Sequence, residues 1–119
     1  MAANFIIVTR EINIMSEVTL TTDGTRTFGG VITVQWRPST TQNSLTVNID
    51  QGGSLLQSLI FDGSGTESFD TGQGTTITTQ GTFTAIFGAG GTTGTLSAHE
   101  FCWDVNGQQG SFKGTIGIW

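Results

Sequence analysis

Charged side chains are scarce in this chain of 119 residues, and those that occur do not cluster. They make up 11% of the sequence, against about 25% in an average globular protein. Four basic and nine acidic residues give a net charge of −5, and the basic ones stand far apart, as Arg10, Arg26, Arg37 and Lys113. Nucleic acids and anionic membranes are bound by clustered lysines and arginines. The composition therefore argues against both as partners.

Long hydrophobic runs are missing as well. The longest purely apolar run covers the four residues 5–8, far too few to cross a bilayer. No basic residue precedes this run, and Thr9-Arg10-Glu11 ends it too early for a secretory signal. We expect no transmembrane segment and no Sec signal peptide, hence a protein made in the cytoplasm that could still end on a cell or spore surface.

Cysteine occurs once, as Cys102. A single cysteine cannot form a disulfide within its own chain, so the fold has to be stabilised by its core. The disulfide open to Cys102 is a bond to another chain. We therefore regard Cys102 as a candidate intermolecular cross-link.

Residue patterns that support catalysis are also lacking. Histidine occurs once, as His99, and tyrosine does not occur. Residues three apart on a strand face opposite sides, so His99 and Cys102 are not expected to form a base and nucleophile pair. Glu100 shares a face with Cys102, where a carboxylate raises the pKa of a thiol. With no nucleophile elbow, His-Glu-x-x-His or Cys-x-x-Cys motif, we expect neither an enzyme nor a cofactor.

Polar uncharged residues are plentiful instead. Thr, Gly, Ser, Gln and Asn together supply 62 of the 119 residues. The sequence is still 35% hydrophobic, with eight phenylalanines and three tryptophans. That is enough apolar material for one core, and the length fits one domain. The composition favours a folded domain with a neutral, hydroxyl-rich surface over a disordered chain.

Hydrophobic residues alternate with polar ones along most of the chain, which is typical of strands with one buried face. Residues 32–37, 45–50 and 95–105 show this pattern most clearly. Residues 55–61 are more continuously apolar, which predicts a central strand. The sequence thus predicts an all-β protein, a single-domain antiparallel β-sandwich or jelly roll of about eight to ten short strands.

The C-terminal hairpin carries a turn signal. Asn106-Gly107 favours a type I′ turn, although the following Gln108-Gln109-Gly110 suggests a longer loop. In the last strand, residues 111–118, the inward positions are Phe112, Ile116 and Ile118. Trp119 is out of phase with these isoleucines. Its large apolar ring is expected to lie uncovered unless a ligand or a neighbouring subunit packs on it.

The N-terminal residues 1–14 are expected to form a separate strand or arm, with the sandwich domain in residues 15–119. An extended chain over residues 5–8 would be apolar on both faces, because Phe5 and Ile7 alternate with Ile6 and Val8. Such a strand is either internal to its own domain or inserted into a partner. The candidate assembly interface therefore consists of Phe5, Ile6, Ile7, Val8 and Trp119.

Two further groups of residues are candidates for ligand binding. Tryptophan rings stack on sugars, and the candidates are Trp36, Trp103 and Trp119, although the first two take the inward phase of their strands. Carboxylates in loops can bind calcium, and the candidates are Asp62, Glu67, Asp70 and Asp104. Their spacing does not match a calcium-binding loop, so we expect no metal site.

Two stretches resemble a known family. Gly-Ser-Gly-Thr-Glu-Ser-Phe at residues 63–69 and Gly-Thr-Leu-Ser-Ala-His-Glu-Phe-Cys-Trp at residues 94–103 resemble a turn and a strand of endospore-appendage pilus subunits. The resemblance implies a jelly roll made without a Sec signal, whose copies augment one another's sheets and cross-link through cysteines of an N-terminal arm. Here residues 1–14 contain no cysteine, so only Cys102 could correspond to a cross-linking position.

The leading hypothesis from the sequence is a non-enzymatic structural protein. Its copies would bind one another and assemble into an oligomer, a fibre or a surface layer, since low charge weakens repulsion between copies. The first alternative is a lectin-like module that binds neutral glycans. The second is a small membrane-active toxin component of the aegerolysin type, which shares the size, acidity and tryptophan content of this chain.

Overall fold

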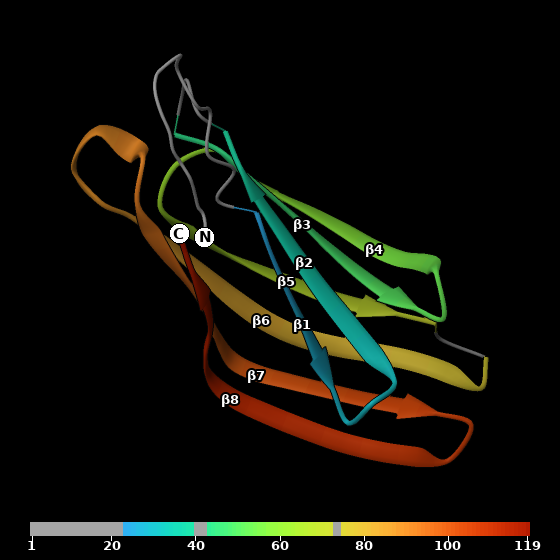
Figure 1. Cartoon of the computed structure of the whole chain (residues 1–119). Helices are drawn as coiled ribbons and strands as arrows, with labels where there is room; N and C mark the ends of the chain where they lie inside the picture. The colour runs from blue at the N-terminus through green and yellow to red at the C-terminus, as the bar shows by residue number, and fades with distance from the viewer. Residues whose placement is uncertain (1–22, 40–42, 73–74) are drawn as a thin grey trace.

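Two four-stranded antiparallel sheets make up the protein in the computed structural model, which describes residues 23–39, 43–72 and 75–119 (Figure 1). The first sheet contains β1 (Gly24–Phe28), β2 (Ile32–Pro38), β3 (Leu45–Gln51) and β4 (Ser54–Phe61). The second contains β5 (Gly65–Thr71), β6 (Ile77–Phe87), β7 (Gly94–Val105) and β8 (Gln108–Ile118), with a short 3-10 turn at Ala89–Gly91 between β6 and β7. Residues 1–14, the expected arm, lie outside the described residues.

The strand order follows the chain in both sheets, β1-β2-β3-β4 and β5-β6-β7-β8. The predicted all-β sandwich is therefore confirmed, and its eight described strands fall within the predicted number. A jelly roll contains Greek keys, in which strands that pair are distant in the sequence. The described strands instead form two meanders, so the described part of the chain is a sandwich without the strand order of a jelly roll.

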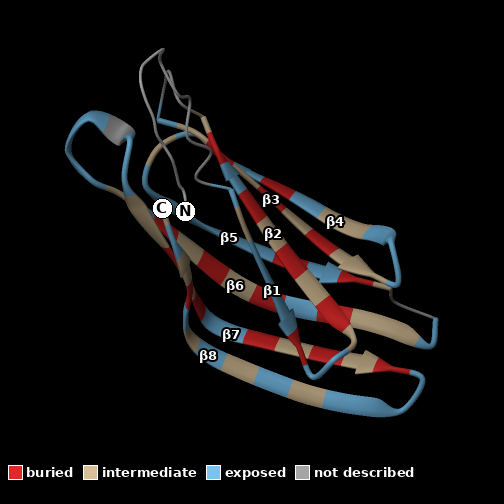
Figure 2. Ribbon diagram, viewed as in Figure 1, coloured by how far each residue is buried: buried red, intermediate tan, exposed pale blue. Residues whose placement is uncertain are grey.

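Alternating burial produces the core, as the sequence predicted for several strands (Figure 2). In β2 and β3 the inward residues Ile32, Val34, Trp36, Leu45, Val47 and Ile49 are all buried. Aromatic side chains fill one end of the space between the sheets. There Phe101 packs against three aromatic neighbours with ring centroids 5.2 to 5.3 Å apart, namely Phe28, Phe83 and Trp103. Such edge-on and tilted contacts are favourable between aromatic rings.

Each tryptophan lies opposite a glycine on the neighbouring strand. The three pairs are Trp36 with Gly24, Trp103 with Gly110, and Trp119 with Gly94. In every pair the indole occupies the space where a Cβ atom of the glycine would be. A bare glycine in a strand exposes its backbone, and an aromatic ring placed over it shields that backbone and gains contact area.

Bulges explain where the predicted alternation fails. In β7 the register shifts between Ala98 and Phe101, so that His99 and Glu100 are both exposed between two buried residues. In β8 a second shift leaves Ile116 without a direct partner between Thr115 and Gly117. A bulge inserts one extra residue and so inverts the faces beyond it.

Because of the second bulge, the predicted orientation of Ile118 and Trp119 was wrong. Ile118, expected inside, is 70% exposed, whereas Ile116 is buried and Phe112 packs partly buried against the core. Trp119, expected to be uncovered, packs against the core, and its ring lies 5.3 Å from that of Phe87 at an angle of 71°. Its own domain therefore already covers much of this side chain.

Two other strand-level predictions were wrong. Residues 55–61 belong to β4, which among the described strands pairs with β3 alone and so lies at the edge of its sheet, not at the centre. This segment has apolar residues on both faces of the strand: Leu59 and Phe61 are buried in the core, whereas Leu55 and Ile60 are exposed. The loop after Asn106-Gly107 is also shorter than expected, because Gln108 pairs directly with Val105.

The two sheets meet at the side where β1 and β8 lie. Arg26 is on the inward face of β1, opposite the buried Val34. Its Nη1 atom donates hydrogen bonds to the carbonyl oxygens of Thr115 and Ile116 at 3.0 and 3.4 Å. The guanidinium also lies over the rings of Phe28 and Phe112. Arg26 therefore bridges two strand edges and closes this side of the sandwich.

Candidate functional site

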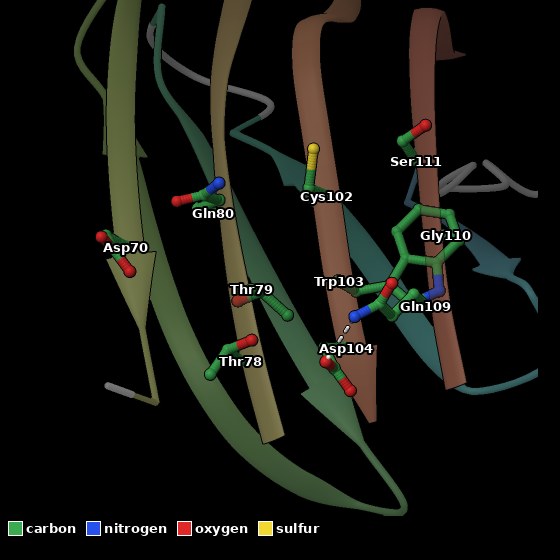
Figure 3. Close-up of a pocket in the computed structure, with 10 residues that line it drawn as sticks. All are labelled: Asp70, Thr78, Thr79, Gln80, Cys102, Trp103, Asp104, Gln109, Gly110 and Ser111. Atoms are coloured by element: carbon green, nitrogen blue, oxygen red, sulfur yellow. Dashed lines mark hydrogen bonds between the residues drawn. The ribbon is translucent and has the colours of Figure 1, made fainter. Parts of the chain in front are cut away.

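A polar groove crosses the outer face of the second sheet near the Asn106-Gly107 turn, with a volume of about 730 Å³ (Figure 3). One row of its side chains runs across all four strands, in the order Asp70, Gln80, Cys102, Ser111. The next row consists of Thr78, Asp104 and Gln109. Directly opposed residues share a face of a sheet, so both rows point outward.

A third row lies between these two and points inward. Its members, Thr79, Trp103 and Gly110, are also in register, and Thr79 and Trp103 are buried. Beneath this row, the hydroxyls of Thr71 and Thr79 are 2.6 Å apart and satisfy each other within the core. Packed side chains of the core therefore support the floor of the groove. Strand pairing fixes the positions of the two outward rows.

Some polar side chains of the groove already form hydrogen bonds within the protein. Asp104 accepts hydrogen bonds from the backbone N–H of Gly107 at 2.8 Å and from the side-chain amide of Gln109 at 3.0 Å. These bonds fix the carboxylate at the turn. In contrast, the side chains of Asp70, Thr78, Gln80 and Ser111 have no hydrogen-bond partner within the part of the chain that the structure describes.

Cys102 lies in the middle of the groove and is half-buried. Its thiol is 3.9 Å from the carboxylate of Glu100, on the same face, as the sequence predicted. Burial raises the pKa of the Cys102 thiol, and the nearby Glu100 carboxylate raises it further. The thiol is accordingly a weak nucleophile at neutral pH.

His99 does not take the position predicted for it. The sequence placed it on the face opposite Cys102, but the bulge brings His99 and Glu100 out together between Ala98 and Phe101. Because both bulge residues are exposed, His99 lies on the outer side, as Cys102 does. The thiol's hydrogen bond within the described residues goes to Glu100.

Of the tryptophans considered for sugar stacking, Trp36 and Trp103 are buried inside the sandwich and Trp119 is partly buried against the core. Trp36 and Trp103 are 7% and 8% exposed, and the ring of Trp119 packs against Phe87 and Gly94. Stacking on a sugar needs a free ring face. In this structure the three rings instead pack against glycines and against other core residues.

The four calcium candidates are not gathered into one site. Asp70 and Asp104 both border the groove, but they lie on β5 and β7 with β6 between them. Asp62 is in the turn after β4, and Glu67 lies three residues before Asp70 on β5, opposite the inward-facing Phe83. Within residues 23–39, 43–72 and 75–119, no group of three or more His, Cys, Asp or Glu side chains could hold a metal ion.

A second candidate surface is the edge of β4. The strands at the edges of the described sheets are β1, β4, β5 and β8. Three of them carry charge, namely Arg26 in β1, Glu67 and Asp70 in β5, and Lys113 in β8. The sequence of β4, Ser-Leu-Leu-Gln-Ser-Leu-Ile-Phe, contains no charge, proline or glycine. In Figure 1 this strand forms the upper right margin of the molecule.

Sequence reasoning missed both surfaces. The sequence does carry a signal for the edge, since β4 is the longest strand of its sheet without a charged residue, but its apolar run also predicts a central strand. The groove had no such signal, because Asp70, Gln80, Cys102 and Ser111 become neighbours only through three strand registers. The predicted interface residues Phe5, Ile6, Ile7 and Val8 lie outside the described residues.

No family model, curated protein or solved structure matches this chain. Within the described residues, no helix is long and apolar enough to cross a membrane.

Proposed function

We propose that this protein is a non-enzymatic structural subunit whose copies assemble by adding a strand to the edge of β4. The observation that carries the proposal is that β4, alone among the four edge strands described, has no charged residue. An edge strand presents unpaired backbone N–H and C=O groups, and proteins that stay monomeric often protect such edges with charges or prolines. The strand β4 has neither, and its one irregularity is a bulge at Leu56, near its first end, which leaves the regular register from Gln57 to Phe61.

The apolar side chains of β4 support the same function. Leu55 and Ile60 are 59% and 62% exposed on this edge strand, so they offer apolar contact area next to the unpaired backbone. Added strands gain affinity from main-chain hydrogen bonds and specificity from side-chain contacts. On the opposite side of the sandwich the edge strands are bridged, because Arg26 of β1 donates hydrogen bonds to backbone oxygens of β8.

The proposed donor is the segment 5–8 of another copy. All four residues of its sequence, Phe-Ile-Ile-Val, are apolar, so an extended strand would have apolar side chains on both faces. Such a strand suits a position that is covered on both sides. The chain enters β1 at Gly24, at the edge of the first sheet opposite β4. Because the donor segment and the acceptor strand β4 are different parts of the chain, the contact is head-to-tail, which builds open chains of subunits unless it closes into a ring.

This proposal rests on β4 and not on the resemblance to pilus subunits. The resemblance implied a jelly roll, whereas the described sheets are meanders. The lone Cys102 lies on the outer face of the second sheet, away from β4, so a covalent bond through it is not part of the proposed contact.

The test compares the full-length chain with two lysine variants by light scattering over a range of concentrations and by negative-stain microscopy. Ile60→Lys places a charge on the proposed acceptor edge. Ile86→Lys is the matched control, because Ile86 is 59% exposed on β6, which has a paired strand on both sides. Both variants change the net charge equally.

We expect the wild type and Ile86→Lys to form concentration-dependent assemblies and Ile60→Lys to dissociate at tenfold higher concentration or more. Ile7→Lys in the full chain should have the same effect as Ile60→Lys if residues 5–8 are the donor. A wild-type protein that is monomeric at every concentration overturns the function. Equal dissociation of both isoleucine variants overturns the assignment of the edge to β4.

A further inference from the structure

We propose that the groove on the outer face of the second sheet binds an uncharged oligosaccharide through hydrogen bonds alone. This site is separate from the β4 edge, and it does not depend on self-assembly. It also differs from stacking on tryptophan, since Trp36 and Trp103 are buried and Trp119 is partly buried against the core, away from the groove.

The first argument is a contrast within one sheet face. On the half of the face away from the groove, opposed hydroxyls satisfy each other, with Thr66 and Thr84 3.0 Å apart and Ser68 and Thr82 2.9 Å apart. In the groove, Asp70 and Gln80 are opposed in the same way but form no hydrogen bond. The same strands therefore present a self-satisfied half and a half whose donors and acceptors remain free.

The second argument is the chemistry of the free groups. Asp70 offers carboxylate acceptors, Gln80 offers both an amide donor and an acceptor, and Thr78 and Ser111 offer hydroxyls that can do either. A saccharide presents hydroxyls that both donate and accept. A carboxylate accepting from neighbouring hydroxyls, with amides and hydroxyls beside it, matches this ligand class.

The third argument is charge. No lysine or arginine lines the groove, so an anionic ligand would meet carboxylates without a compensating cation. Of the two carboxylates present, Asp104 is already held by Gly107 and Gln109. One free carboxylate among neutral groups gives a basic peptide little to bind. An uncharged polyhydroxylated ligand fits best.

The shape agrees with this ligand. The groove lies along a row of four strands, and neighbouring strands are about 4.8 Å apart, so the row spans roughly 14 Å. A volume of about 730 Å³ is within the usual range for small-molecule sites. An extended ligand of a few sugar units could therefore contact Asp70, Gln80 and Ser111 together.

The experiment screens the full-length protein against an array of neutral and acidic glycans and measures the best neutral oligosaccharide by calorimetry. The test variants are Asp70→Asn and Gln80→Ala, which remove free groups of the groove. Ser68→Ala is the matched control, because Ser68 lies two residues from Asp70 on the same face but pairs with Thr82. Circular dichroism and thermal unfolding check that each variant is folded.

Cys102 supplies an independent readout, since it is the only cysteine and lies in the groove. A bound oligosaccharide should slow alkylation of its thiol by iodoacetamide. We expect neutral glycans to bind, the two groove variants to weaken binding at least tenfold, and Ser68→Ala to bind as the wild type does.

Three outcomes would overturn the proposal. The first is no binding of any neutral glycan. The second is binding that Asp70→Asn and Gln80→Ala leave unchanged, or that leaves Cys102 unprotected. The third is a preference for acidic glycans or for a lysine-rich peptide used as a competitor. Failure here leaves the assembly proposal intact, because Ile60 and Asp70 lie on different sheets.

Discussion

The indole of Trp103 lies against Gly110, the residue directly opposite it on β8. A methyl group on Gly110 would overlap the ring atoms, and the ring is held by Phe28 and Phe101. We therefore expect Gly110→Ala to lower the free energy of unfolding by about 1–3 kcal/mol, because overpacking forces side chains and backbone to shift. Urea denaturation would measure the change.

Gly65→Ala is the control for that substitution. Gly65 is also a strand glycine, but an added Cβ meets no atom within 4 Å. Since glycine loses more backbone freedom than alanine on folding, this variant should be about 0.5 kcal/mol more stable than the wild type. Equal destabilisation by both variants would show that the contact with Trp103 is not the cause.

The buried hydroxyls of Thr71 and Thr79 give a second prediction. They are 2.6 Å apart, and Thr71 can also donate to the backbone carbonyl of Thr79 at 3.4 Å. Thr71→Val leaves the Thr79 hydroxyl without this partner and should cost about 1–3 kcal/mol. Thr79→Val should cost less, because Thr71 keeps the carbonyl.

The double variant completes this test. Thr71→Val with Thr79→Val removes both hydroxyls at nearly constant shape, so its stability should lie closer to the wild type than that of Thr71→Val alone. Thermal unfolding of the four proteins forms a double-mutant cycle. Additive losses would contradict the proposed mutual hydrogen bond.

The turn between β7 and β8 gives a third prediction. Asn106 and Gly107 both have positive φ, 53° and 89°, as a type I′ turn requires. Gly107→Ala should destabilise the protein by about 1 kcal/mol, because a Cβ is strained in this region. Asn106→Gly should be nearly neutral. Denaturation midpoints would separate the two, and a neutral Gly107→Ala would contradict the turn.

The fourth prediction concerns the pH dependence of the Cys102 thiol. Burial and the Glu100 carboxylate both raise its pKa, so alkylation should rise at higher pH than for an exposed cysteine peptide. Glu100→Gln removes the second cause and should shift the rate profile to lower pH, but not to that of the peptide. Because the folded-state pKa is raised, any contribution to stability is present at neutral pH and lost as the pH rises through that pKa. An unchanged profile in Glu100→Gln would exclude the carboxylate as a cause.

Much of the fold was predictable because alternation alone decides which face of a strand is buried. The buried faces of β2 and β3 follow directly from residues such as Val34 and Val47. The errors have two physical origins. A bulge at Ile116 inverted the faces of Ile118 and Trp119, and no pattern in the sequence marks a bulge. A run of apolar residues also does not distinguish β4 as an edge from a central strand.

The candidate site was less predictable than the fold. Pairing of Trp36 with Gly24, or of Asp70 with Gln80, depends on strand register, which a single sequence does not reveal. The inward phase of Trp36 and Trp103 correctly predicts core packing, but it does not reveal that each ring lies on a glycine. Their large size is needed because each covers a glycine.

The meander order of the strands also bears on how the protein folds. Within each sheet, every described strand is hydrogen-bonded to the strands next to it in the chain, so each sheet can grow hairpin by hairpin without waiting for distant segments to meet. Folding slows as native contacts become more distant in sequence. The contact of Arg26 with Thr115, 89 residues apart, would then form late, joining two sheets that are already paired. We expect this sandwich to refold faster than a Greek-key sandwich of equal length.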